Sequence, residues 1–235
     1  MNVELAPPQA LPPLLVVGAG KLGSAVAEAW INHGGTVREA VGAGETWVPE
    51  GLVFEATAPD SAFDNVMRCV DASVPVVTGT TGWLDRLDEL ETAIAGEKST
   101  AFWSTNFSPG VHALNQIAQH AAGIFEKIPG YRAQIHEVHH IHKKDAPSGT
   151  AIMLQQHAMQ GGWSQALPIE SKREGEVIGL HALAWDSVHD AVVLQHEAKS
   201  RLGFAEGAVW ALRWTWQRHL EHEFGLYTMT DLFRP

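Results

Sequence analysis

The run from His136 to Ala151 carries a dense group of side chains that could do chemistry. It holds four histidines, two lysines and two acids within ten residues, followed by Pro-Ser-Gly-Thr. Such a run makes a poor core, because every buried titratable group would need its own compensating partner. Histidine exchanges protons near neutral pH and lysine supplies a cation. The run therefore predicts a site that transfers protons beside a bound anion.

A helix is expected to begin at the end of this run. Pro147 stops the preceding segment, and Ser148 or Thr150 can cap the helix. The backbone amides of Gly149, Thr150 and Ala151 are then expected to form an anion site at the positive end of the helix dipole.

The same run satisfies the zinc-peptidase pattern H-E-x-x-H at His136, Glu137 and His140. That pattern requires a helix, where histidines four residues apart share a face. The residues from 131 to 138 alternate as in a strand, and in a strand His136 and His140 would lie about 13 Å apart, too far to share one zinc ion. No metal site is therefore expected. A zinc hydrolase and a solvated polar loop remain the alternatives.

A glycine-rich loop near the N-terminus supplies a second candidate site. A short buried strand at 14–17 leads into Gly18-Ala19-Gly20-Lys21-Leu22-Gly23, and helical character continues from Ser24. Strand, G-x-G-x-x-G and helix in this order form the dinucleotide fingerprint, whose glycines permit a tight turn, close approach of the pyrophosphate and close helix packing. This context favours dinucleotide binding over a glycine-rich turn without a ligand.

The choice between NADH and NADPH depends on the residues after the next strand, expected at 36–41. An acid about 20 residues beyond the fingerprint usually binds the ribose hydroxyls. Glu45 is the best placed candidate, whereas Glu39 would lie within the strand, and Lys21 or Arg38 could instead favour a 2′-phosphate. Either cofactor is therefore expected to bind, with a lean towards NADH.

Strands and helices alternate through the first part of the chain, which predicts a Rossmann-like, doubly wound parallel sheet. Further strands are expected at 52–56, 75–78 and 100–103, with helices to about 70 and over 84–95. Ligands bind beyond the carboxyl ends of such strands. Further cofactor-binding candidates at these ends are Gly79, Thr80, Thr81, Ser104, Thr105, Asn106 and Phe107.

A second, smaller α+β domain with an open mixed sheet is expected next. A long helix covers 111–128, strands are expected at 131–138, 177–184 and 190–198, and one helix at 149–160 interrupts them. The expected boundaries are 1–108 for the dinucleotide-binding domain, to which the chain returns at about 202–235, and 109–201 for the second domain.

Composition narrows the class of partner. The 235 residues are 45% hydrophobic and carry a net charge of −11, which disfavours nucleic acid and anionic membranes. No apolar run reaches the ~20 residues of a membrane span. The single cysteine, Cys69, cannot form an intramolecular disulfide, which fits a reducing cytoplasm.

Residues 137–151 closely resemble the signature of the dihydrodipicolinate reductase family, E-[AV]-H-H-x-x-K-x-D-A-P-S-G-T-A. This family is also called 4-hydroxy-tetrahydrodipicolinate reductase. Residues 79–82 match its G-T-T-G, residues 106–110 match N-F-S-x-G, and residues 200–208 resemble S-R-x-x-F-A-x-G-A. The resemblance extends from Leu14 to the end of the chain.

The resemblance implies an NAD(P)H-dependent oxidoreductase that reduces 4-hydroxy-tetrahydrodipicolinate to tetrahydrodipicolinate in diaminopimelate and lysine biosynthesis. It implies that His139 donates or accepts a proton, that Lys143 is a second proton donor and that His140 contacts the substrate. Gly149 and Thr150 would hold a carboxylate of the dicarboxylate substrate. The second domain would bind this substrate and build a homotetramer through its sheets.

One further cofactor candidate and two departures from the family pattern complete the comparison. Arg201, within the last motif, could reach the cofactor. The glycine loop is one residue shorter than the family's usual G-x-x-G-R-M-G, and residues 183–189 stand where a longer R-x-G-x-x-x-G-x-H stretch is expected between Gly179 and His196. A non-catalytic NAD(P)-binding sensor is the remaining alternative.

Overall fold

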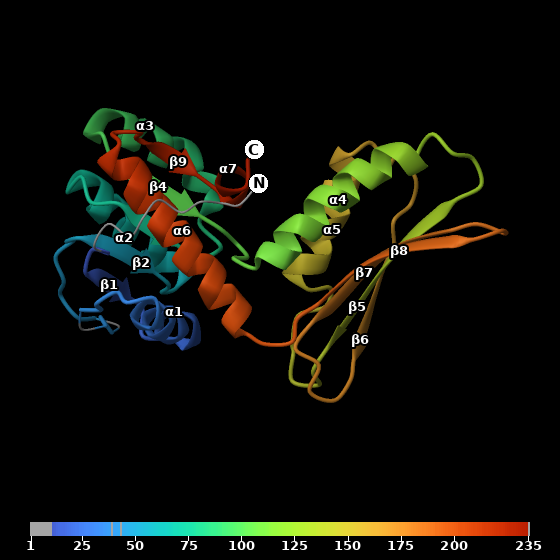
Figure 1. Ribbon diagram of the computed structural model, residues 1–235, viewed down its shortest axis with the longest axis horizontal. Helices are drawn as coiled ribbons and strands as arrows, with labels where there is room; N and C mark the ends of the chain where they lie inside the picture. The colour runs from blue at the N-terminus through green and yellow to red at the C-terminus, as the bar shows by residue number, and fades with distance from the viewer. Residues whose placement is uncertain (1–10, 39, 43, 235) are drawn as a thin grey trace. The chain divides into compact units, whose positions relative to one another are not determined.

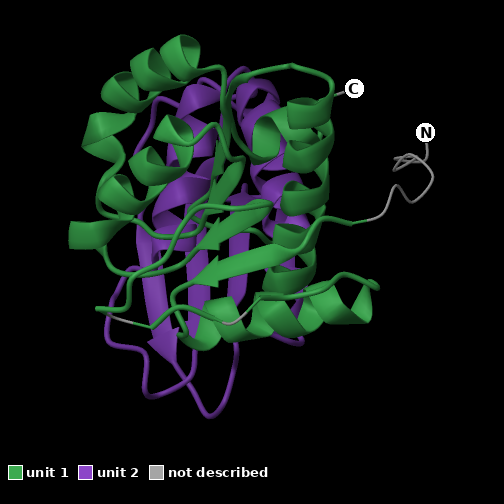
Figure 2. Ribbon diagram, turned by 90° about the vertical axis from the view of Figure 1, so that its left-hand side faces the viewer, with its two compact units in different colours: residues 1–108, 204–235 green, residues 109–203 purple. Residues whose placement is uncertain are grey.

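The computed structural model describes residues 11–38, 40–42 and 44–234 (Figure 1). The chain forms two compact units, one of Met1–Ser108 with Phe204–Pro235 and one of Pro109–Gly203 (Figure 2). No helix in the described ranges is both long and apolar enough to cross a membrane.

The first unit is built on a parallel sheet with the strand order β1-β2-β3-β4-β9. Its strands β1 to β4 are almost entirely buried, as expected where helices cover both faces of a parallel sheet. The strands are β1 (Leu14–Val17), β2 (Leu52–Glu55), β3 (Val76–Thr78), β4 (Thr100–Trp103) and β9 (Gly225–Tyr227).

Alternate residues of β1 enter two separate apolar cores. Leu14 and Val16 pack with residues of α1 and α6, whereas Leu15 and Val17 pack with residues of α2 and α3. The sheet is therefore covered on both faces, which confirms the Rossmann-like, doubly wound fold. The helices are α1 (Lys21–Asn32), α2 (Pro59–Asp71), η1 (Leu84–Arg86), α3 (Leu87–Glu97), α6 (Leu202–Leu220) and α7 (Met229–Leu232).

The strand expected at 36–41 is not a continuous strand. The segment makes two isolated parallel bridges to β1, Leu14 with Val37 and Val17 with Val41. Between these bridges the segment has one residue more than β1, five against four, as in a bulge. Glu39 lies outside the described residues. The 37–41 segment and β2 pair with opposite sides of β1, so the strand order reverses at β1. Ligands bind at such a reversal point in sheets of this kind.

The second unit holds a mixed sheet with the strand order β6-β5-β7-β8, in which only the β5–β6 pair is parallel. Two helices, α4 (Pro109–Phe125) and α5 (Gly149–Gln160), share an apolar core with this sheet. The expected open mixed sheet and the helix at 149–160 are confirmed. The strands are β5 (Arg132–His139), β6 (Ile169–Arg173), β7 (Leu180–Asp186) and β8 (Ala191–Glu197).

Several elements depart from the sequence-based expectations. The strand expected from 177 begins at Leu180, and β6, β9 and α7 were not expected at all. The sequence of β6 is Ile-Glu-Ser-Lys-Arg, with no apolar alternation, because it is an exposed edge strand. Its structure depends on pairing with β5 and not on its own pattern.

Candidate active site

The two faces of β5 have different environments. Ala133, Ile135, Glu137 and His139 are buried, whereas His136 points to the other face, where its Nδ1 lies 3.0 Å from Glu170. The strand expected over the H-E-x-x-H run is confirmed. Along an extended segment His136 and His140 lie about 13 Å apart, so the run does not assemble the zinc site of the helical pattern.

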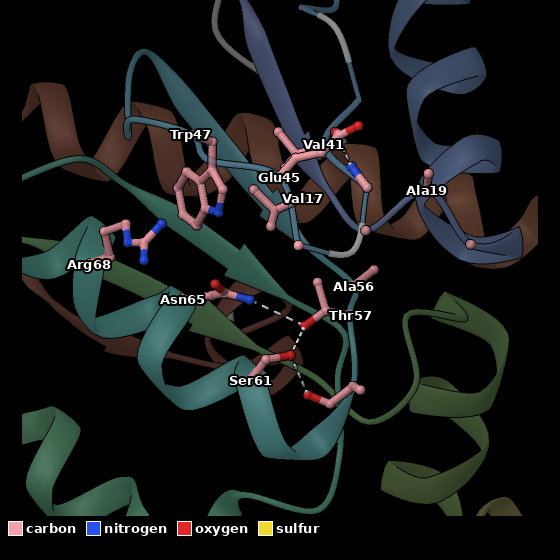
Figure 3. A pocket seen from close by; sticks show the side chains of 15 residues that line it. Val17, Ala19, Val41, Glu45, Trp47, Ala56, Thr57, Ser61, Asn65 and Arg68 are labelled. Carbon is pink, nitrogen blue, oxygen red and sulfur yellow. Dashed lines mark hydrogen bonds between the residues drawn. The ribbon is translucent and has the colours of Figure 1, made fainter.

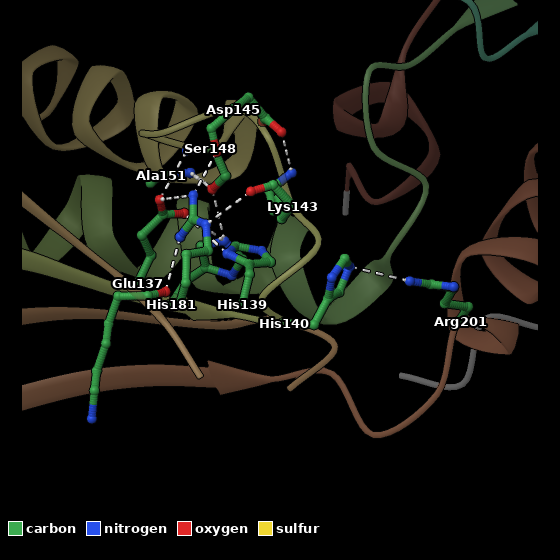
Figure 4. A network of polar contacts seen from close by, with 11 residues as sticks. Glu137, His139, His140, Lys143, Asp145, Ser148, Ala151, His181 and Arg201 are labelled. Atoms are coloured by element: carbon green, nitrogen blue, oxygen red, sulfur yellow. Dashed lines mark hydrogen bonds and ion pairs between the residues drawn. The ribbon is translucent and has the colours of Figure 1, made fainter. Parts of the chain in front are cut away.

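Glu137 is the buried centre of a polar network on the inner face (Figure 4). Its carboxylate is fully buried, and Oε1 accepts a hydrogen bond of 3.0 Å from the backbone amide of Ser148. Its Oε2 lies 3.3 Å from Nδ1 of His139. Burial raises the pKa of Glu137, but hydrogen bonds from Ser148 and Ser171 bring it below its ordinary value. The side chain is therefore a carboxylate at neutral pH.

His139 and His181 lie beside this carboxylate with their rings nearly perpendicular and 5.0 Å apart. The Nε2 of His181 is 3.1 Å from the hydroxyl of Ser148. Burial lowers the pKa of His139, although Glu137 acts in the opposite direction. Burial lowers the pKa of His181 to about 4. Two imidazoles that are neutral near pH 7 thus flank one carboxylate.

The loop between β5 and α5 is held by Arg173 of β6. Its guanidinium donates to the carbonyls of Lys143 and Asp145, and its Nη2 lies 3.5 Å from Oε1 of Glu137. Within the loop, Nζ of Lys143 lies 2.9 Å from the carboxylate of Asp145, and this hydrogen bond lowers the pKa of Asp145. The two predicted proton-transfer residues, His139 and Lys143, therefore belong to one charged cluster.

Ser148 caps helix α5, as expected. Its hydroxyl accepts a hydrogen bond of 3.2 Å from the amide of Ala151, so that amide is no longer available to an anion. The predicted carboxylate contacts are then Gly149 and Thr150. A Cβ built on Gly149 would meet nothing within 4 Å, which leaves room for a ligand.

Arg201 lies in the same unit as the signature run. Its Nη2 is 3.4 Å from Nε2 of His140. Arg201 thus lies beside the predicted substrate contact in residues 137–151. The expected contact of Arg201 with the cofactor stays a prediction.

The glycine-rich loop borders a cavity of about 670 Å³ in the first unit (Figure 3). Gly18 has φ +111°, and a Cβ there would lie 2.2 Å from the carbonyl oxygen of Ala56. A Cβ at Gly23 would lie 2.0 Å from the carbonyl oxygen of Gly18, whereas one at Gly20 would meet nothing. Helix α1 starts without a side-chain cap. An open glycine before uncapped helix amides fits a pyrophosphate.

Glu45 also lines this cavity, together with Ala19. Its carboxylate accepts a hydrogen bond of 2.7 Å from the amide of Gly42. Arg38, one candidate for a 2′-phosphate, instead pairs with Glu50.

The cation that lines the cavity is Arg68. It was not expected, because its position on α2 belongs to no motif, and its guanidinium lies 4.8 Å from the centroid of the Trp47 ring. The other candidate for a 2′-phosphate, Lys21, begins α1 and is not among the residues that line the cavity.

The loops after β3 and β4 lie at the expected carboxyl ends. A Cβ on Gly79 would come within 2.9 Å of Leu22 and 3.1 Å of Phe107, so close packing requires glycine there. Phe107 is 2% exposed and, like Leu22, packs into the core, so its side chain is not open to a ligand. The hydroxyl of Thr80 is buried without a hydrogen-bond partner in the described part of the chain, which leaves it available to a bound group.

The remaining candidates in these loops have different environments. Thr81 and Thr105 are exposed, whereas Ser104 and Asn106 hold their own turn, since the Ser104 hydroxyl accepts from the Asn106 amide and donates to its carbonyl. Their cofactor contacts stay predictions.

Two family descriptions match most of the chain. "Dihydrodipicolinate reductase, C-terminus" matches residues 110–233, and "Dihydrodipicolinate reductase, N-terminus" matches residues 50–107. The chain belongs to the dihydrodipicolinate reductase family. The resemblance seen in the sequence is thereby confirmed. The N-terminal match begins after the glycine-rich loop, whose spacing departs from the family's usual pattern.

Curated relatives carry the name 4-hydroxy-tetrahydrodipicolinate reductase. The relative from Christiangramia forsetii is 36% identical over 192 residues, 77% of this chain and 78% of its own. The relative from Anaplasma marginale is 36% identical over 199 residues, 78% of this chain and 73% of its own. A dipicolinate-bound dihydrodipicolinate reductase from Paenisporosarcina sp. TG-14 shares the fold, with a TM-score of 0.74, 20% identity and coverage of 94% and 99% of the two chains.

Sequence reasoning missed two residues of the cluster around Glu137, Arg173 and His181. The stretch R-x-G-x-x-x-G-x-H is not replaced by residues 183–189, because it lies earlier in the chain than expected. It is intact as Arg173-x-Gly175-x-x-x-Gly179-x-His181, and residues 183–189 only complete β7 and its turn into β8. The sequence pattern at 173–181 thus carries a signal for both residues.

Glu137, His139 and His181 could also offer ligand atoms to one metal ion, since these atoms lie within 4.8 Å of one another. However, Arg173 places a guanidinium 3.5 Å from the same carboxylate. A fixed positive charge opposes a metal cation at that distance. The arrangement suits proton transfer better than metal binding.

Proposed function

We propose that this chain reduces 4-hydroxy-tetrahydrodipicolinate to tetrahydrodipicolinate with NADH or NADPH, in diaminopimelate and lysine biosynthesis. Its membership of the reductase family and the names of its relatives support the reductase activity predicted from the sequence. The observation that carries the proposal is the placement of His139 and Lys143 in one cluster around buried Glu137, beside the start of α5.

The chain's own residues supply the proton. When bound, the cofactor would supply a hydride to the substrate ring, and the 4-hydroxyl of the substrate leaves as water. Burial lowers the pKa of His139, so its imidazole is neutral near pH 7 and acts by accepting a proton and passing it on. Lys143 is the second donor, and Asp145 holds its ammonium 2.9 Å away.

The substrate is a dianion, while the chain carries a net charge of −11, so its binding depends on local donors. Gly149 and Thr150 at the positive end of the α5 dipole hold one carboxylate. His140 contacts the substrate, and Arg201 beside it adds positive charge. The second unit is thus the substrate-binding domain.

The first unit is the dinucleotide-binding domain. Gly18, Ala19 and Gly20 border the cavity before α1 and receive the pyrophosphate, and Glu45 receives the ribose hydroxyls. Arg68 is the basic residue placed to meet a 2′-phosphate. Titrating the fluorescence of the protein with each cofactor tests this assignment, and binding of neither would remove the reductase proposal.

The second unit also mediates assembly into a cytoplasmic homotetramer. Its sheet has a face that carries exposed apolar side chains such as Val193, which is 55% exposed. Such a face needs a cover, and a second copy of the sheet would supply one. Light scattering tests the tetramer, which a monomer at micromolar concentration would contradict. No nucleic acid or membrane partner is proposed.

The deciding experiment measures oxidation of NADH and NADPH with substrate generated in situ from pyruvate and aspartate semialdehyde. Substrate-dependent oxidation is expected. Cofactor binding without oxidation would support the sensor alternative. Stoichiometric zinc in elemental analysis, together with inactivity towards the substrate, would support the hydrolase alternative.

A further inference from the structure

We infer that Glu137 is a positioning residue that holds His139 as its Nδ1–H tautomer and leaves Nε2 to exchange the proton. The catalytic consequence rests on the proposed function, whereas the tautomer itself does not. Both residues lie on the inner face of β5, two positions apart, so their side chains point the same way.

The two facing atoms, Oε2 of Glu137 and Nδ1 of His139, lie within ion-pair distance of each other, and neither makes a hydrogen bond to a described residue. Both atoms are buried. They lie 3.3 Å apart, whereas Nε2 of His181 is 3.9 Å from the same oxygen and already 3.1 Å from the Ser148 hydroxyl. An unpaired buried carboxylate oxygen is unfavourable, so a proton on Nδ1 of His139 is the arrangement that satisfies both atoms.

Gly179 packs against the opposite side of the His139 ring. A Cβ built on Gly179 would lie only 3.1 Å from Nε2 of His139. Glycine at this position leaves space beside the nitrogen that the inferred tautomer makes the proton acceptor. The reacting end and the anchored end of the imidazole are therefore distinct.

Charged groups from every neighbouring element face His139. Glu137 from β5 and Asp145 from the loop favour the protonated ring, whereas Lys143 from the loop and Arg173 from β6 oppose it. His181 from β7 is neutral at pH 7, because burial lowers its pKa to about 4. These charges act in opposite directions on the ring as a whole. The choice between Nδ1 and Nε2 therefore depends on the direct contact of Nδ1 with the Glu137 carboxylate.

The substitution Glu137→Gln gives a sharp test, because the amide can enter in only one orientation. Oε1 receives the Ser148 amide and faces the Arg173 guanidinium, so this position must remain an oxygen. The NH₂ group then replaces Oε2 and faces Nδ1 of His139. Because this NH₂ group donates a hydrogen bond, Nδ1 of His139 must accept it. The ring proton then lies on Nε2.

The experiment records nitrogen and carbon NMR spectra of histidine-labelled protein, with the His139 signals assigned from their loss in His139→Gln. We expect Nδ1–H in the wild type and Nε2–H in Glu137→Gln. Glu170→Gln is the matched control, because Glu170 pairs with His136 at 3.0 Å on the outer face, and it should leave the His139 signals unchanged.

Kinetics supply the second measurement. Glu137→Gln should lower kcat by about 10²-fold, the low end for lost proton transfer, with little change in KM. Its pH profile should move to lower pH, because the carboxylate that raises the pKa of His139 is gone. Glu137→Asp keeps the charge, so it should retain the Nδ1–H tautomer and part of the activity. If Glu137 only stabilised the fold, the charge-keeping variant would have no reason to preserve the tautomer.

Two results would overturn the inference. One is an Nε2–H tautomer for His139 in the wild type, and the other is the same tautomer in the wild type and in folded Glu137→Gln. If Glu137→Gln does not fold, the wild-type and Glu137→Asp spectra still decide. A wild type that oxidises neither cofactor would reject the proposed function but leave the tautomer result intact.

Discussion

Gly179 of the β6–β7 connection and His139 at the end of β5 lie in such close contact that a methyl group added to Gly179 would sit 3.1 Å from Nε2 of His139. His181 also borders this position, with Cε1 3.5 Å from the same methyl group. A glycine far along the chain thus determines the space around the nitrogen that we assign to proton transfer.

Gly179→Ala should therefore lower turnover by about tenfold, because the His139 ring must move by a few tenths of an ångström and small misplacements weaken proton transfer. The fold should remain, as the backbone at this position is compatible with alanine. Steady-state kinetics and thermal unfolding check this. Gly175→Ala is an unsuitable control because its φ is +49°, whereas Gly203→Ala meets open space and should be neutral. Wild-type turnover in Gly179→Ala would contradict the assignment.

Removing either proton-transfer group should have a large effect. His139→Ala and Lys143→Ala should each lower turnover by about 10²–10⁴-fold, the usual range for lost proton transfer. His136→Ala is the control, because that side chain lies on the outer face of β5 beside Glu170. The assignment is wrong if His136→Ala is the inactivating change while the other two variants stay active.

The anion site can be tested with pyridine-2,6-dicarboxylate, a flat ring with two carboxylates. It should compete with the substrate. Thr150→Val keeps the shape but removes the hydroxyl, and should raise the inhibition constant about tenfold, which corresponds to ~1.5 kcal/mol for a hydrogen bond to a charged group. Gly149→Val should weaken binding further through steric exclusion. A Thr150→Val variant that weakens only cofactor binding would place the carboxylate elsewhere.

The buried His181 should make stability depend on pH. Its pKa is about 4 in the folded chain against an ordinary 6.5, so the unfolded chain binds more protons between these values. Its contribution is therefore fully present above pH 6.5 and is lost as the pH falls towards 4. His181→Gln should flatten this dependence by about 3 kcal/mol.

Denaturant unfolding of the wild type and of His181→Gln at several pH values would measure this difference. His136→Gln serves as a control on the outer face of β5. Parallel pH dependences for the wild type and His181→Gln would show that His181 does not titrate on unfolding.

The local parts of this protein could be predicted from its sequence. Alternation identified β5, the Ser148 cap and helical spacing identified α5, and the glycine fingerprint identified the turn from β1 into α1. These features depend on neighbours within a few residues, through side-chain periodicity and capping. The signature run added the proposed roles of His139 and Lys143 by family resemblance.

Only the tertiary structure brought Arg173 and His181 to Glu137. Strand register decides this, because Glu137 pairs with His181 across β5 and β7, and His139 pairs with Arg173 across β5 and β6. A shift of one residue would turn either side chain to the other face of the sheet. That register is set by hydrogen bonds between strands far apart in the chain and by the core they share, neither of which the polar sequence of β6 encodes by itself.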